Sequence, residues 1–247
     1  MLKGFWKLSW VEAKVFVREP MGLFGTIGMP VILFLVLGRV LAAGPKDLAP
    51  ASAPPFNVAI LGALLIALGS VQSLVAIIAI YREGGILKRL RATPLSPVTI
   101  LSAQVGVKLA FALVSLSLLV LAGKRVFPGV MHVNVISFAG ALLLSTFSIL
   151  SLGFVLASIV PTARFAQPIG TAVLYPMLAL SGLFFPVDRL PHAAQIAALA
   201  LPTTHAVALM QGIWDGSGWA AHWMDAGALI VFFAVFTALS TRVFRWE

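Results

Sequence analysis

Side chains able to hold a metal ion or to move protons are few in this sequence and widely spaced. The four histidines, His132, His192, His205 and His222, form no HExxH pair and have no carboxylate at ligand spacing. Acidic residues number only eight in 247, and they allow no defensible Ser-His-Asp order. We therefore predict no catalytic residue, no cofactor site and no metal site in this chain, and we interpret the histidines as polar residues at a membrane interface.

A nucleotide-binding motif is also missing from the sequence. It contains no phosphate-binding loop of the form GxxxxGK[ST], so we expect no ATP binding by that route. Acidic residues within a membrane would mark a proton- or sodium-coupled carrier, and their scarcity argues against that class. The nearest candidate, Asp225, lies about a turn inside the outer end of the last apolar segment, so we expect an interfacial role for it.

The composition indicates an all-α integral membrane protein. Hydrophobic residues make up 60% of the chain, charged residues 10%, and the mean hydropathy is +1.04. A water-soluble domain could not bury so many apolar side chains, whereas a bilayer requires about 20 of them per spanning helix. The net charge of +9 then reflects membrane topology, and no nucleic-acid partner is expected.

Apolar runs long enough to cross a membrane predict six spans in a single domain covering residues 1–247. They comprise residues 21–43, 56–80, 101–122, 133–160, 165–185 and 221–241. An even number places both termini on one side, and eleven basic residues against four assign that side to the cytoplasm. Two basic residues, Arg39 and Lys108, fall inside predicted spans, and we expect each to extend to its nearer interface.

Residues 1–20 predict a separate amphipathic helix lying in the inner membrane interface, which Pro20 ends. At 100° per residue its four cations fall within about 60° of one another. These cations are Lys3, Lys7, Lys14 and Arg18. The opposite side gathers Leu2, Phe5, Trp6, Ala13, Phe16 and Val17. Such a helix could serve as a membrane anchor or could contact a partner protein.

Residues 186–219 are too interrupted by proline for one span and too apolar for a solvated loop. Two short helices fit this segment. Pro191 would begin the first, Pro202 would end it, and Thr203 or Thr204 would cap the second. We predict an interfacial or re-entrant helical hairpin on the outer face.

The loop after the second predicted span reads "YREGGILKRLRATPLSP" and predicts a short cytoplasmic helix. Gly84 and Gly85 break the span, and Pro94 and Pro97 end the new helix. Its apolar stripe consists of Ile86, Leu87 and Leu90, and its cations are Lys88, Arg89 and Arg91. Contact with anionic lipid explains the charge, whereas the stripe between two stops indicates docking into a groove of another protein.

Two stretches carry a resemblance to a known family. "YREGGILKRLRATPLSPVTIL" resembles the segment after the second span in membrane permeases of type 2 ABC exporters, and "LSGLFFPVDRLPHAAQIAALALPTTHAVALMQGIW" resembles the exit from their fifth span. Together with six spans and the N-terminal helix, the match covers essentially the whole chain. The sequence departs from the family pattern at Tyr81, Gly85 and Gln211, which leaves the local contacts of these positions open.

The resemblance implies a permease that dimerises, as a homodimer or a heterodimer, in a bacterial-type plasma membrane. It implies two separate ATP-binding subunits that carry ATP and Mg²⁺, and the chain itself performs no chemistry. The hairpin at residues 186–219 would cap the pathway. Coupling to the ATPase would fall to Glu83, Gly84, Ile86, Leu87, Lys88, Arg89, Leu90 and Arg91. The connecting helix beside them would contain Phe5, Trp6, Lys7, Lys14 and Arg18.

Polar side chains within the predicted spans are candidates for the transport pathway. They are Gln72, Ser73, Gln104, Ser148, Gln167 and Thr171. Hydrogen bonding between helices would satisfy these groups equally well, so both interpretations stay open. An ATP-independent carrier or channel, and a scaffold whose basic loop binds lipid or a regulator, are the competing functions. Relatives export drugs, antibiotics, polysaccharides or lipid-linked molecules, and the sequence does not select among these substrates.

Overall fold

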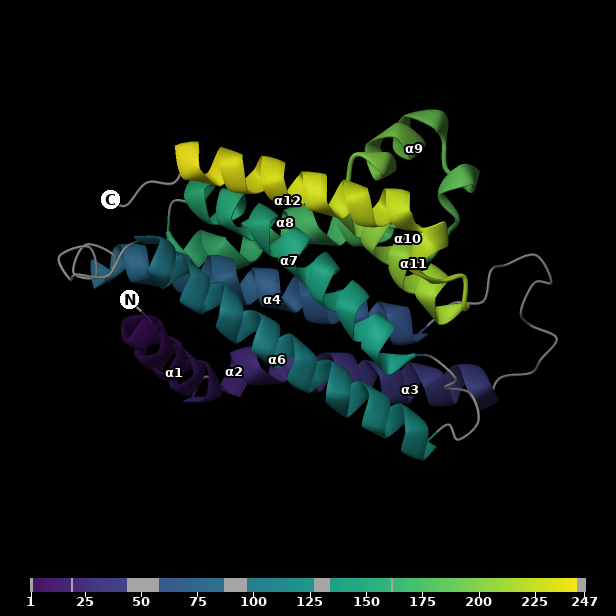
Figure 1. The fold of residues 1–247 in the computed structure, drawn as a ribbon, viewed down its shortest axis with the longest axis horizontal. Coiled ribbons are helices and arrows are strands. Elements are labelled where there is room, and N and C mark those ends of the chain that lie inside the picture. The colour runs from purple at the N-terminus through teal and green to yellow at the C-terminus, as the bar shows by residue number, and fades with distance from the viewer. Residues whose placement is uncertain are drawn as a thin grey trace.

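The protein folds into a bundle of long helices that run along one common direction (Figure 1). This computed structural model describes residues 2–18, 20–43, 58–86, 97–126, 134–160 and 162–243. Every regular element within these residues is a helix, as the composition predicts.

The N-terminal helix and the first predicted span are separated at the expected residue. Helix α1 covers Leu2–Arg18, and α2, Pro20–Leu23, begins at the proline, which restricts the residue before it and has no N–H to donate. A π-helical segment, η1, Phe24–Gly28, follows and leads into α3, Met29–Ala43. The first predicted span is therefore helical throughout but contains one widened turn, which the sequence pattern does not reveal.

Four helices are long and apolar enough to cross a membrane. They are α4, Val58–Glu83; α6, Pro97–Val126; α7, Val135–Ile159; and α12, Trp223–Val243. Each contains most of one predicted span. The side chain of Asn134 accepts hydrogen bonds from the N–H groups of Ile136 and Ser137, so it caps the start of α7.

The fifth predicted span is shorter than expected. Helix α8, Ala163–Ala179, has 17 residues and ends six residues before the predicted boundary at Phe185. The chain leaves helical geometry there, and Gly182 adopts a left-handed backbone with φ +85°. Within the described residues, α8 and the apolar stretch Phe24–Leu37 are shorter than the four spanning helices. Six spans therefore remain a prediction.

Residues 187–221 form a group of short helices, which includes the two predicted for this region. These are η3, Val187–Arg189; α9, His192–Leu199; α10, Pro202–Trp214; and α11, Gly218–Ala221. The axes of α9 and α10 differ by 81°, and the pair would count as a fifth span only if taken as one bent helix. Pro191 and Pro202 lie at the predicted helix boundaries.

The predicted threonine cap of α10 is wrong. No side chain caps this helix, and both threonines donate to carbonyls of other segments instead. Thr203 Oγ1 donates to the Met177 carbonyl at 2.9 Å, and Thr204 Oγ1 to the Ala198 carbonyl at 2.6 Å. Because both residues are buried, these bonds satisfy polar groups that water cannot reach. They tie the start of α10 to the ends of α8 and α9.

Helix α4 lies at the centre of the bundle and packs against α3, α6, α7 and α8. Its side chains at Leu64, Leu74 and Ile78 are completely or almost completely buried. An added Cβ on Gly153 of α7 would lie 3.1 Å from Val71 of α4, so glycine allows these two helices their close approach. Helix α4 thus contacts the first helical segments as well as α6, α7 and α8.

The ends of the bundle differ in structure (Figure 1). Helix α1, the last turn of α4 and the C-terminal end of α12 lie at one end. The short helices α9 and α11 lie at the opposite end. The side of the membrane on which each end of the bundle lies stays a prediction.

Candidate functional site

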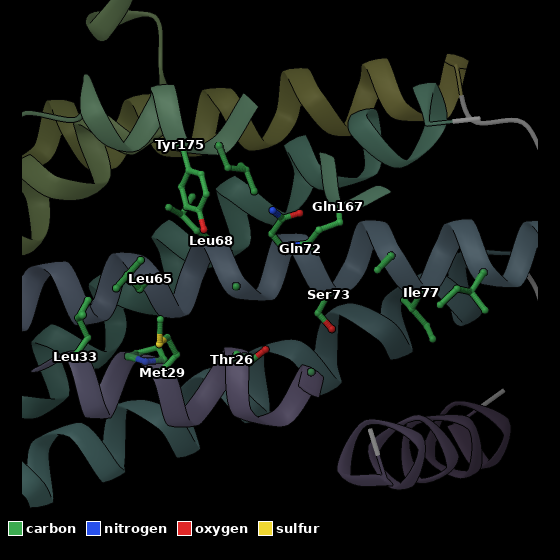
Figure 2. A pocket seen from close by; sticks show the side chains of 17 residues that line it. Thr26, Met29, Leu33, Leu65, Leu68, Gln72, Ser73, Ile77, Gln167 and Tyr175 are labelled. Atoms are coloured by element: carbon green, nitrogen blue, oxygen red, sulfur yellow. The ribbon is translucent and has the colours of Figure 1, made fainter. Parts of the chain in front are cut away.

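A cavity of about 560 Å³ opens between the first helical segments, α4 and α8 (Figure 2). Its walls come from α2, η1 and α3 on one side and from α4 and α8 on the other. The lining residues are mostly apolar and include Met29, Leu33, Leu65, Leu68 and Ile77. The volume lies in the range typical of small-molecule sites.

Three of the predicted pathway residues line this cavity: Gln72, Ser73 and Gln167. Figure 2 shows the Gln72 and Gln167 side chains next to each other, between α4 and α8. A fourth, Thr171, accepts a hydrogen bond from Gln72 Nε2 at 3.1 Å. The Gln72 amide oxygen packs directly on Gly170, where a Cβ would collide with it. The sequence pattern thus selected residues that the fold brings together, although their role in transport stays a prediction.

The other two predicted pathway residues lie elsewhere. Ser148 is fully buried in α7, and Gln104 is buried in α6 beneath α1. Neither residue is among those that line the cavity. Residues that contribute to the cavity but were not selected include Thr26 and Tyr175, which belong to the π-helical segment and to α8. Only the tertiary arrangement places them opposite α4.

The prediction that Lys108 extends to the membrane interface is wrong. Its side chain is only 3% exposed, and Nζ donates a hydrogen bond of 2.6 Å to Ser73 Oγ. The ammonium also lies 4.2 Å from the centre of the Phe16 ring in α1. These contacts, together with the charge of the nearby Glu12, stabilise a buried cation that would otherwise seek water. Arg39, by contrast, is exposed near the end of α3.

Helix α1 is fixed to the bundle by a buried carboxylate. Glu12 is 5% exposed, and both of its carboxylate oxygens accept from the Tyr81 hydroxyl of α4 at 2.9 Å. The side chain of Gln104 of α6 is buried nearby. The sequence analysis missed Glu12, although at 100° per residue it falls within about 40° of both Phe5 and Phe16 on the helix. The sequence feature that could have indicated it is a single acidic residue in an otherwise basic helix.

Burial raises the pKa of Glu12 above its ordinary value, while the hydrogen bond from Tyr81 and the charge of Lys108 oppose the shift. The folded protein therefore holds this proton more tightly than the unfolded chain does. The Glu12 contribution to stability is fully present below pH 4.5, its unfolded pKa, and is lost as the pH rises through the raised folded pKa.

Replacing Glu12 by Gln is expected to remove that part of the pH dependence. The amide keeps the shape and can still bond Tyr81, but it does not titrate. The measurement is thermal unfolding in detergent from about pH 4, near the ordinary pKa of a glutamate, to about pH 8. An unchanged slope in the Glu12→Gln variant would contradict the assignment.

The expected apolar side of α1 is only partly covered by the rest of the protein. Phe16 is buried against α6 and stacks near Phe111 with ring centres 4.5 Å apart, and Phe5 is half-buried beside Gly106. Trp6 and Val17, expected on the same side, are exposed. Some apolar side chains of α1 therefore pack against the rest of the protein, and others are exposed on its surface. Its predicted cations Lys7, Lys14 and Arg18 are exposed.

A second contact joins the inner end of α4 to α7. The Arg82 guanidinium donates to the Val160 carbonyl at 2.9 Å and to the Ala157 carbonyl at 2.8 Å. These carbonyls belong to the C-terminal turn of α7. Carbonyls there have no N–H partner within the helix, and the helix dipole favours a cation. Tyr81 and Arg82 are adjacent, so one turn of α4 holds both α1 and α7.

The predicted coupling segment begins directly after this turn. Glu83 is exposed in the last turn of α4, and Gly84 and Gly85 form the predicted break, Gly85 with φ +64°. Ile86 lies just beyond it, partly buried. The remaining predicted coupling residues lie outside the described part of the chain: Leu87, Lys88, Arg89, Leu90 and Arg91.

A polar cluster at the opposite end of the bundle joins α10 to α12. The two carboxylate oxygens of Asp225 lie 2.8 Å from His205 Nδ1 and 3.0 Å from His222 Nδ1. His205 Nε2 lies 3.1 Å from the Leu199 carbonyl at the end of α9. The histidines were expected to be scattered, but the fold brings two of them onto one carboxylate. No group of ligands suited to a metal ion occurs among the residues that the structure describes.

Comparison with known proteins gives a match over most of the chain. The sequence model described as "ABC-2 type transporter" matches residues 3–214. Nodulation protein J of Rhizobium leguminosarum bv. trifolii is 36% identical over 95 residues, 38% of this chain and 36% of that protein. The inner membrane transport permease YhhJ of Escherichia coli strain K12 is 29% identical over 166 residues, 66% of this chain and 44% of that protein. The chain thus covers less than half the length of either relative.

Proposed function

Because the chain belongs to the ABC-2 type transporter family, we propose that it is the membrane subunit of an ATP-driven exporter. The family is one of transport permeases, and membership implies association with ABC ATP-binding subunits. We place ATP and Mg²⁺ on two such subunits and assign no catalytic step to this chain. Two permease copies, identical or different, would enclose the pathway within a bacterial inner membrane. No nucleic acid takes part.

The observation that supports this proposal most directly is the cavity between α3, α4 and α8. Gln72, Ser73 and Gln167 provide polar groups there, together with Thr26 and Tyr175, in a mostly apolar wall. A molecule that passes through a membrane protein needs such a compartment, because lipid offers no partner for its polar atoms. We infer that this cavity is one protomer's part of the pathway.

The inner end of the bundle offers a route by which an ATPase could act on that cavity. Glu12 joins α1 to Tyr81, and Arg82 joins α4 to α7. We propose that residues 86–93 form a coupling helix in the cleft of the ATP-binding subunit, with α1 beside it. Movement of this segment would then shift α1, α4 and α7 together, as packed elements move in discrete steps. Both termini would be cytoplasmic, and residues 186–219 would cap the outer exit.

The first test is affinity purification of the tagged chain from its native membranes. We expect an ATP-binding protein with a phosphate-binding loop to co-purify, and we expect the reconstituted complex to transport only with ATP. Vesicles containing the chain alone are the control. Transport by the chain alone, with no associated ATPase, would instead establish an ATP-independent carrier or channel.

Replacing Leu90 by Asp is expected to uncouple ATP hydrolysis from transport while membrane insertion stays normal. The charge would lie in the apolar stripe that we propose enters the ATPase cleft. Charge reversal at Lys88, Arg89 and Arg91 should have the same effect. The measurement is the number of ATP molecules hydrolysed per molecule transported. Unchanged coupling in both variants would favour lipid contact as the role of this loop.

Replacing Gly170 by Ala is expected to lower transport about tenfold, equivalent to about 1.4 kcal/mol, without unfolding the protein. The new Cβ would displace the Gln72 amide from Thr171 toward the cavity. Alanine itself favours a helix over glycine by about 1 kcal/mol, so the fold should persist. Gly25→Ala is the matched control, because Gly25 lines the same cavity and a Cβ there meets no atom within 4 Å. Equal transport by both variants would contradict the role of Gln72.

A further inference from the structure

The cavity presents no charged side chain among the lining residues that the structure describes. Its polar groups are side-chain amides and hydroxyls, and the remaining wall is apolar. Figure 2 shows the Tyr175 hydroxyl directed toward α4, on the same side as the Gln72 and Gln167 amides. A ligand in this cavity would therefore find neutral hydrogen-bonding groups along one part of its surface and apolar contacts elsewhere.

The cation nearest to these groups is withdrawn from the cavity. Lys108 lies behind Ser73, is almost completely buried, and does not line the cavity. The Phe16 ring covers its ammonium, and Glu12 supplies an opposite charge close by. A cationic ligand would lose its hydration in the cavity without gaining a counter-charge, and for an anionic ligand Glu12 offsets the attraction of Lys108. This arrangement selects against ionic ligands.

The hydrogen bond from Lys108 also determines what Ser73 can offer. An ammonium group only donates, so Ser73 Oγ accepts in the 2.6 Å bond between them. The serine proton is then available to donate to another acceptor. A charge-assisted bond to the oxygen polarises the hydroxyl and strengthens it as a donor. On the cavity wall, Ser73 is thus a hydrogen-bond donor held in place by Lys108.

We propose that the cavity binds an uncharged molecule with an apolar body and an oxygen acceptor, such as a carbonyl, ether or hydroxyl, which accepts from Ser73. The amides of Gln72 and Gln167 flank this contact, and Lys108 acts as a positioning residue for it. This inference rests on the proposed function, which assigns the cavity to the transport pathway. Binding, however, is measured on the purified chain without any ATPase, so failure of either idea can be recognised separately.

The test uses four probes with the same aromatic body, measured by energy transfer from tryptophan in nanodiscs. They are 1-acetylpyrene with a carbonyl acceptor, 1-ethylpyrene without one, anionic pyrenebutyrate and cationic pyrenylmethylammonium. We expect 1-acetylpyrene to bind about five- to tenfold more tightly than 1-ethylpyrene, the effect of roughly one hydrogen bond. Both charged probes should bind more weakly than 1-acetylpyrene.

The variants Ser73→Ala and Lys108→Met should bring the affinities for 1-acetylpyrene and 1-ethylpyrene together. Ser70→Ala is the matched control, since Ser70 is also in α4 but donates to the Ile66 carbonyl of its own helix. A general loss of structure would weaken both neutral probes equally, so the ratio isolates the hydrogen bond. Ser73→Thr keeps a hydroxyl and should retain the preference. Tighter binding of a charged probe, or a ratio unchanged by Ser73→Ala, would overturn the proposal.

Discussion

Replacing Glu12 by Lys is expected to detach α1 from the bundle and to abolish ATP-coupled transport. The new ammonium would lie near Lys108 in a place that excludes water, and it could not accept the Tyr81 hydrogen bond. Leaving a buried charge uncompensated in this way typically costs about 3–5 kcal/mol. The measurement is hydrogen exchange of the α1 amides, which should become fast, together with ATP-dependent transport in vesicles.

Glu83→Lys is the matched control for this variant. It makes the same change of charge in the last turn of α4, where the side chain is exposed. We expect slow exchange in α1 and normal folding for Glu83→Lys. Slow α1 exchange in Glu12→Lys would show that Glu12 does not hold the helix. Fast α1 exchange in both variants would show that net charge, rather than the buried contact, is responsible.

Replacing Arg82 by Ala is expected to reduce coupled transport about tenfold while ATP hydrolysis continues. The variant loses two hydrogen bonds to the C-terminal carbonyls of α7, and hydrogen bonds to charged groups contribute about 1.5–3 kcal/mol. Without them, α4 could move at its inner end without carrying α7. The measurement is the ratio of transport to hydrolysis in the reconstituted complex.

Two further variants distinguish this contact from a general effect of charge. Arg82→Lys keeps the cation but cannot place two donors in the fork that bonds both carbonyls, so we expect an intermediate ratio. Arg164→Ala removes an exposed cation from the start of α8 and should leave coupling unchanged. A normal ratio in Arg82→Ala would mean that α7 follows α4 through packing alone.

The outer cluster shows how far polar residues can be interpreted without coordinates. His205 and His222 are separated in sequence by sixteen residues, and neither spacing nor composition pairs them. The 81° bend between α9 and α10 and the short α11 bring both rings onto Asp225. The expectation of an interfacial role for Asp225 named no partner. Its contacts depend on the turns between helices, which local sequence describes poorly.

The sequence by itself determined the membrane class and most of the segment boundaries. Apolar length predicts the long helices, and the breaks at Pro20, Gly84 and Pro202 lie where predicted. These features are local, because proline removes an N–H and glycine permits left-handed backbone wherever they occur. Family motifs in the same chain pointed to the transporter family that the comparison supports.

Only the tertiary structure decided which way the polar side chains face. Glu12 contacts Tyr81, Lys108 contacts Ser73, and Gly170 contacts Gln72. In each pair the two residues are far apart in sequence and lie on different helices. In a helix with apolar residues on all sides, the pattern does not indicate which face meets protein and which meets lipid. Buried polar atoms must find partners, and the packing of α1, α4, α6 and α8 determines which partners they find.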